Sequence, residues 1–171
     1  MEENEWYFPS PDQLRLDVYY QIAEGVKGIS YYVKSHYEGH PELEGEIGRI
    51  NKELQAVKNY LAISEPVEGL AEASDPAVQA HTLVCGDYGL ALILINTDYD
   101  TGREGKERYT DVTPREDFHV EVKLPHWLEA GRVFMVGQDI WRVDFKTEAN
   151  RVIIPVSRLD LTGMYLIHPE R

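Results

Sequence analysis

The chain has a single cysteine, Cys85, so it cannot form an internal disulfide or a thiolate metal cluster. It also has no run of about 18 apolar residues, the length that a membrane span needs, and its first residues, MEENEWYF, lack the basic and apolar regions of a signal peptide. We expect Cys85 to be a buried, inert thiol. These absences lead us to expect no metal, no cofactor and no membrane partner, and they leave the cellular compartment open.

Positive charge is scarce as well. The 171 residues include 30 Asp and Glu but only 17 Lys and Arg, which gives a formal net charge of −13. A nucleic-acid partner is therefore not expected, because binding to phosphates needs a basic face. An acidic surface is compatible with neutral sugars or basic partners, and equally with a protein that is acidic only to stay dispersed.

The sequence also lacks a complete catalytic signature. No P-loop, dinucleotide fingerprint or nucleophile elbow is present. At 43% hydrophobic and 27% charged residues, the composition is that of a globular chain, long enough for one domain or for one domain plus a piece of another. We therefore predict no catalytic residues in this chain.

The first part of the sequence predicts a helix that ends at Gly25. Ser10 can cap the helix, Pro11 fits its first position, and Gln13 completes a capping box with Ser10. Apolar residues mark a core face: Leu14, Val18 and Ile22, with Tyr19 and Ala23 beside them.

A short strand and a second helix are expected next. The run GVKGISYY (25–32) predicts a buried strand over residues 26–33 that has no partner strand nearby in sequence. A helix begins near Pro41 and ends before Pro66, with an apolar stripe of Leu43, Ile47, Ile50, Leu54, Val57 and Leu61. Gly45 and Gly48 lie inside this helix at a cost of about 1 kcal/mol each, which suggests close approach of another backbone, such as that of the short strand.

After Pro66 the pattern is that of an all-β domain. Strands are expected over 78–84, 90–95, which is apolar on both faces, 118–124, 132–136, 139–145, 151–157 and 164–168, with a hairpin turn at Gly86-Asp87. Between 96 and 117 we expect a flexible charged loop, whose spacing approximates a calcium loop but lacks the required glycine. The fold class is therefore α+β, with residues 1–64 followed by an antiparallel β-sandwich over residues 65–171.

The order helix, GxKGIxYY, helix is that of one step of a parallel (β/α)8 barrel. The run PSPDQLRLDVYYQIAEGVKGISYY (9–32) resembles the segment around the last strand of (β/α)8-barrel glycoside hydrolases, with Val26 in place of the usual alanine. ELEGEIGRINKELQ (42–55) is similar to the closing helix of such barrels, and residues 65–171 are similar to the β-sandwich that often follows them.

This resemblance implies that residues 1–64 are the remnant of a barrel whose earlier strands are absent, and that Met1 is an artificial or truncated start. The two catalytic carboxylates of the family follow the fourth and seventh barrel strands, so we expect the chain to be inactive alone. It would then be a non-catalytic C-terminal fragment or subunit of a glycoside hydrolase-like protein. Its expected partners are a carbohydrate and either the missing barrel portion or a second copy, because surfaces made for the barrel would be exposed.

The loop after the predicted strand 26–33 supplies candidate sugar contacts. Tyr32, His36, Tyr37 and His40 lie where barrel enzymes place substrate contacts, at the carboxyl end of a strand. Aromatic rings can stack on sugar faces, and imidazoles can bond to hydroxyl groups. An ordinary polar loop is the alternative interpretation, and a metal site built on His36, Glu38 and His40 is a weaker one.

Trp127 is a further candidate, since it follows Pro125-His126 near a predicted turn and could stack on a sugar together with Trp141. The alternative is that both indoles lie in the sandwich core. If the barrel resemblance is misleading, the chain would be a stand-alone carbohydrate-binding or adhesion module, or a structural or assembly domain without a ligand.

Overall fold

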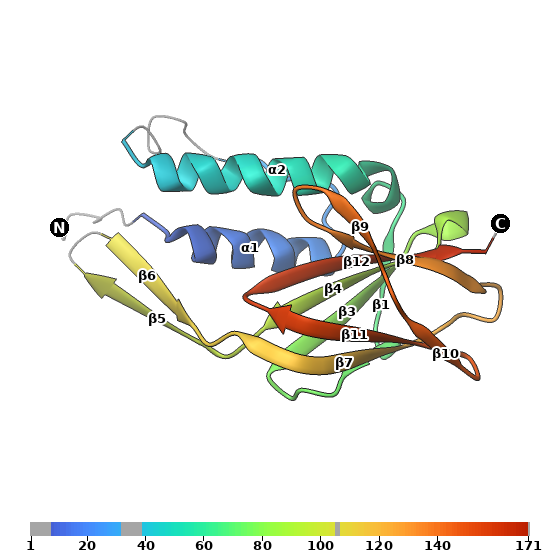
Figure 1. The fold of residues 1–171 in the computed structure, drawn as a ribbon. Helices are drawn as coiled ribbons and strands as arrows, with labels where there is room; N and C mark the ends of the chain where they lie inside the picture. Colours follow the sequence, from blue (N-terminus) through green and yellow to red (C-terminus); the bar gives the residue numbers. More distant parts are fainter. Residues whose placement is uncertain (1–7, 32–38, 105–106, 171) are drawn as a thin grey trace.

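The structure is a computed structural model that describes residues 8–31, 39–104 and 107–170. These residues form two helices, α1 (Pro11–Ala23) and α2 (Pro41–Leu61), followed by a β-rich part (Figure 1). The strands are β1 (Glu65–Val67), β2 (Ala71–Ala73), β3 (Val78–Val84), β4 (Leu90–Asn96), β5 (Tyr99–Glu104), β6 (Glu107–Val112), β7 (Arg115–Lys123), β8 (Ala130–Val136), β9 (Ile140–Val143), β10 (Lys146–Glu148), β11 (Arg151–Leu159) and β12 (Thr162–Pro169).

The strands build two packed sheets and a separate hairpin. The larger sheet has the order β1-β3-β4-β12-β8-β9, the smaller has the order β10-β11-β7-β2, and β5 pairs with β6. Every pairing between described strands is antiparallel. The α+β class and the antiparallel sandwich are therefore confirmed.

Strand β4 is the centre of the molecule because each of its faces belongs to a different core. Ala91, Ile93 and Ile95 pack against the helices, while Leu90, Leu92 and Leu94 pack against the smaller sheet. All of these residues are fully buried, as the doubly apolar run predicts.

Helix α1 begins as its sequence predicts. Ser10 Oγ accepts a hydrogen bond from Gln13 N at 3.1 Å, and Gln13 Oε1 accepts one from Ser10 N at 3.4 Å, so the capping box is complete. At the other end Gly25 adopts a φ of +84° and donates from its N–H to Ile22 O. The five predicted core residues of α1 are all buried.

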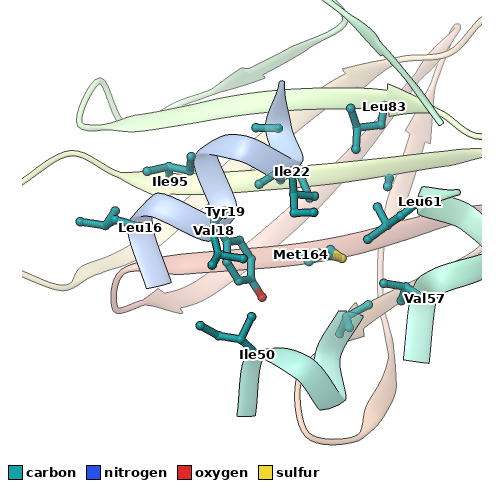
Figure 2. Packing of buried hydrophobic residues seen from close by; sticks show 14 of the residues in the cluster. Leu16, Val18, Tyr19, Ile22, Ile50, Val57, Leu61, Leu83, Ile95 and Met164 are labelled. Carbon is teal, nitrogen blue, oxygen red and sulfur yellow. The ribbon is translucent and has the colours of Figure 1, made fainter. Parts of the chain in front are cut away.

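The first core lies between the helices and the larger sheet. Figure 2 shows side chains of α1 (Leu16, Val18, Tyr19 and Ile22) together with side chains of α2 (Ile50, Val57 and Leu61) and of the sheet (Leu83, Ile95 and Met164). This core joins residues from before and after position 65. The division into residues 1–64 and 65–171 therefore stays a prediction.

The stripe predicted for α2 is confirmed: Leu43, Ile50, Val57 and Leu61 are buried, and Ile47 and Leu54 are half-buried and pack against the first core. The remaining two buried positions hold the carboxylates of Glu46 and Glu53. The buried face of α2 therefore includes two charged residues that an apolar pattern cannot reveal.

The predicted strand over 26–33 is not formed in the described part of the chain. Residues 26–31 run on from α1 without joining any sheet, and residues 32 and 33 lie outside the described residues. Ile29 and Tyr31 nevertheless pack against the first core. A strand needs a neighbour for its backbone hydrogen bonds, and none of the described strands is placed to provide one.

Two other expectations are wrong. A Cβ built on Gly45 or on Gly48 would meet no described atom within 4 Å, so no described backbone approaches α2 at these glycines. The charged stretch between 96 and 117 is mostly the β5–β6 hairpin, where Asp100 pairs with Asp111. Asn96, at the first position of the calcium-like spacing, is buried, and its side-chain amide donates to two backbone carbonyls.

Cys85 is fully buried, and burial raises the pKa of its thiol to about 11, as expected for an inert cysteine. Neither of the two described helices is both long and apolar enough to cross a membrane.

Candidate functional site

Of the four loop residues predicted to contact sugar, only His40 can be placed, since Tyr32, His36 and Tyr37 lie outside the described residues. His40 directly precedes α2, and its carbonyl oxygen accepts from the N–H groups of the first turn. Its ring stacks on Phe8 with centroids 4.0 Å apart, and its Nδ1 lies 3.4 Å from Glu42 Oε1. These contacts fix the start of α2, so a sugar contact at His40 stays a prediction.

Trp127 and Trp141 both lie at the surface, so the alternative of a buried core position is wrong for each. Trp127 is 46% exposed in the β7–β8 connection, and Trp141 is 48% exposed on edge strand β9. The indole of Trp141 covers the β8–β9 turn, where a Cβ added to Gly137 would come within 2.8 Å of it. Trp127 therefore remains the freer candidate for stacking on a ligand.

The two predicted contact regions are far apart. The β7–β8 connection is tied to the last residues of the chain by the hydrogen bond from Glu170 N to Glu129 O. Figure 1 places the C-terminus at the opposite side of the molecule from the start of α2. His40 and Trp127 cannot contact one small ligand together, because the 21 residues of α2 alone span about 30 Å.

The buried carboxylates of α2 meet Arg15 of α1. Arg15 Nε lies 2.5 Å from Glu46 Oε1, and its two terminal nitrogens lie 3.0 and 2.9 Å from the oxygens of Glu53. Tyr19 donates its hydroxyl to Glu53 at 2.6 Å, and Arg49 donates to Glu46 at 2.7 Å. This charge network holds the two helices together.

The electrostatics of the network are those of a structural site. Burial, and next the charge of Glu53, raise the pKa of Tyr19 well above its ordinary value, so the hydroxyl stays protonated and continues to donate. Burial works to lower the pKa of Arg15, but its bonds to Glu53 outweigh that effect and raise it. Both carboxylates are occupied, which leaves neither of them free as a general acid or base.

A depression on the outer side of the smaller sheet combines apolar and charged residues in its lining. It has a volume of about 440 Å³ and is lined by His119, Asp144, Phe145, Lys146, Glu148, Ile153 and Pro155. No sequence pattern predicted it, because its residues come from β7, β10, β11 and the β9–β10 connection. A smaller depression of about 260 Å³ lies beside α2, between Tyr60 and the strands β8, β9 and β12.

No protein-family model matches the sequence, and no curated protein matches it. Solved structures do match its fold. One is a cycloisomaltooligosaccharide glucanotransferase from Paenibacillus sp., solved in complex with cycloisomaltoheptaose, at a TM-score of 0.60 and 11% identity over 74% of this chain and 21% of that one. Another is α-L-fucosidase isoenzyme 2 from Paenibacillus thiaminolyticus, at a TM-score of 0.48 and 15% identity over 80% of this chain and 19% of that one.

The likeness to the glucanotransferase includes part of the helical region. Residues 65–171 are 107 of the 171 residues, so a match over 74% of the chain cannot be confined to the β-rich part. The chain spans about a fifth of the length of each of these two structures. Its fold is thus similar to a portion of the glucanotransferase.

Proposed function

We propose that this chain is a non-catalytic, C-terminal part or subunit of a glycoside hydrolase-like protein, and that it acts on carbohydrate by binding rather than by hydrolysis. The observation that carries the proposal is the fold: two helices and a sandwich share one core, in an arrangement similar to a portion of the glucanotransferase. The likeness concerns the fold alone, so the carbohydrate connection is a hypothesis for experiment.

The segment 26–31 supports the idea that this chain completes a larger assembly. Within the described chain, the backbone groups of Gly28, Ile29 and Ser30 form no hydrogen bond. The segment is held from the side by Lys27, whose ammonium donates to Leu61 O at 3.1 Å and to Ser64 Oγ at 2.9 Å. An anchored segment with open backbone groups is suited to pair with a strand supplied by another part of the protein or by another chain.

The absence of hydrolysis follows from the same proposal. The catalytic carboxylates implied by the resemblance would stand on barrel strands that precede residue 8, while Glu46 and Glu53 are engaged in ion pairs. The earlier barrel strands would be needed for activity, and if they lie on a separate chain, mixing that chain with this one should restore hydrolysis.

A stand-alone carbohydrate-binding module is the second candidate, and the exposed indole of Trp127 favours it. The two candidates differ in association. The first predicts self-association or dependence on a partner through the segment 26–31, whereas the second predicts a monomer at all accessible concentrations. Sedimentation velocity over a range of concentrations tests for the self-association that only the first candidate allows.

The test of the proposed function is calorimetric titration with neutral oligosaccharides (isomalto-, malto-, cello- and laminari-series), followed by chromatography of the titrated solution. We expect binding to at least one series and no shortened products. Trp127→Ala should weaken the binding if the indole stacks on sugar, and Tyr88→Ala, which removes another exposed ring, is the matched control. Product formation by this chain, or the absence of binding to every series, would refute the proposal.

A further inference from the structure

The depression on the outer side of the smaller sheet lies where the sheet is incomplete. Strand β10 pairs with residues 151–153 of β11 only, so the edge of β11 beyond Ile153 is open on that side. Pro155 stands on this open edge, opposite His119 of β7. The backbone N–H of His119 donates to Ser74 Oγ, and its carbonyl accepts from Ser74 N, on the side of β7 away from β11. The pairing of β7 with β11 at this position therefore does not need an N–H from residue 155, and a proline is tolerated there.

The walls of the depression combine an apolar surface with charges of both signs. Phe145, Ile153 and Pro155 provide the apolar surface. Around them stand two carboxylates, Asp144 and Glu148, together with Lys146 and His119. Ligand sites of small molecules have this character, a mostly apolar lining with a few polar groups that fix the orientation.

Three charged side chains of the depression differ from their neighbours in lacking partners, whereas His119 Nε2 lies 3.8 Å from Glu121 Oε1. On the same sheet face Arg151 binds Glu121 at 2.5 Å, and Arg158 binds Glu116 at 2.9 Å. Within the described residues, by contrast, the side chains of Asp144, Lys146 and Glu148 form neither a hydrogen bond nor an ion pair, although all three line one depression. All three residues are exposed, so their side chains are accessible to a ligand that enters the depression.

We infer that this depression is a binding site for a neutral saccharide, with Phe145, Ile153 and Pro155 against the apolar face of a sugar ring and Asp144, Lys146, Glu148 and His119 bonding to its hydroxyl groups. A hydroxyl group both donates and accepts, so it satisfies a carboxylate and an ammonium equally well. An anionic ligand would face Asp144 and Glu148, and a cationic ligand would face Lys146. A neutral ligand rich in hydroxyl groups meets all of these side chains without repulsion.

This inference rests on the proposed function and adds to it the location of the sugar. Trp127 lies outside the depression, so the two candidate contact sites can be separated by substitution. Loss of a charged partner from a sugar hydroxyl is expected to weaken binding by about tenfold.

The test uses the oligosaccharide that binds most tightly in the calorimetric titration and measures its Kd for Lys146→Ala and Glu148→Ala. The matched controls are Lys52→Ala, on the exposed side of α2, and Glu68→Ala, in the β1–β2 turn. We expect the two depression variants to lose about tenfold in affinity and the two controls to bind like the wild type. Thermal unfolding of each variant confirms that its fold is retained.

Amide chemical shifts give an independent readout without substitution. Addition of the same oligosaccharide should move the resonances of His119, Lys146 and Ile153. If binding is intact in both depression variants and only Trp127→Ala abolishes it, the inference is wrong while the proposed function stands. If no neutral oligosaccharide binds, both are wrong.

Discussion

The charge network between the helices leads to a quantitative prediction for Arg15→Met. The guanidinium of Arg15 is the main partner of Glu53 and one of two cationic partners of Glu46, and these carboxylate side chains are only 7% and 6% exposed. Removing Arg15 leaves Glu53 with the Tyr19 hydroxyl as its only partner from the network. Breaking a buried ion pair on one side costs about 3–5 kcal/mol, because a charge remains buried without compensation.

We expect the lower end of that range, about 3 kcal/mol, because Glu46 keeps Arg49. For a chain of this length, that loss corresponds to a fall in Tm of about 6–12 °C. Urea unfolding followed by circular dichroism measures the free energy directly. In the variant Arg15→Met/Tyr19→Phe/Glu46→Leu/Glu53→Leu, Arg49 is the only charge of the network that remains, and it is 49% exposed, so most of the stability should return.

The matched control is Arg158→Met. Arg158 also bonds two carboxylates, Glu116 and Asp160, but all three side chains are more than half exposed. Exposed ion pairs contribute about 0–1 kcal/mol, so the control should unfold almost like the wild type. If Arg15→Met loses no more stability than Arg158→Met, the network does not hold the helices together and the reasoning is refuted.

Three further predictions concern single positions. Burial raises the pKa of Tyr19 above its ordinary value of 10.0, so the unfolded chain loses this proton at a lower pH than the folded chain does. The free energy of unfolding should therefore decline as pH rises above 10. This decline, measured between about pH 9 and pH 11, should be smaller in Tyr19→Phe. Cys85, with its pKa raised to about 11, should react with Ellman's reagent only as fast as the protein unfolds, and rapid reaction of the native chain would contradict its burial. Gly89→Ala should cost at least about 2 kcal/mol, since the residue has a φ of +109° and its new Cβ would lie 2.0 Å from Ile167 O, whereas Gly69→Ala, in open space at a φ of +72°, should cost less in the same urea titration.

The elements that the sequence predicted well are those whose signals are local. The caps of α1 depend on residues three positions apart, and the two-sided burial of β4 shows directly as an uninterrupted apolar run. The register of β7 follows from strict alternation, and Phe118, Val120 and Val122 are all buried as predicted.

The errors occur where a distant residue decides the outcome. Glu46 and Glu53 are buried only because Arg15, more than thirty positions earlier, meets them. The β5–β6 hairpin is rich in charge and has no apolar alternation, so its sequence is typical of a loop. The candidate site was also only partly predictable: the exposure of Trp127 follows from its turn, but the depression at Pro155 forms from segments that meet only in the folded sheet.

Hydrogen–deuterium exchange at Gly28, Ile29 and Ser30 tests most directly the claim that this chain completes a larger protein. In the isolated chain at low concentration, these amides should exchange almost as fast as in an unfolded peptide, while β4 should be the most protected segment, and protection at 28–30 should appear only on association with another strand. Slow exchange of these three amides in a monomer would show that the segment already has its partner, and the proposed role as part of a barrel protein would be wrong.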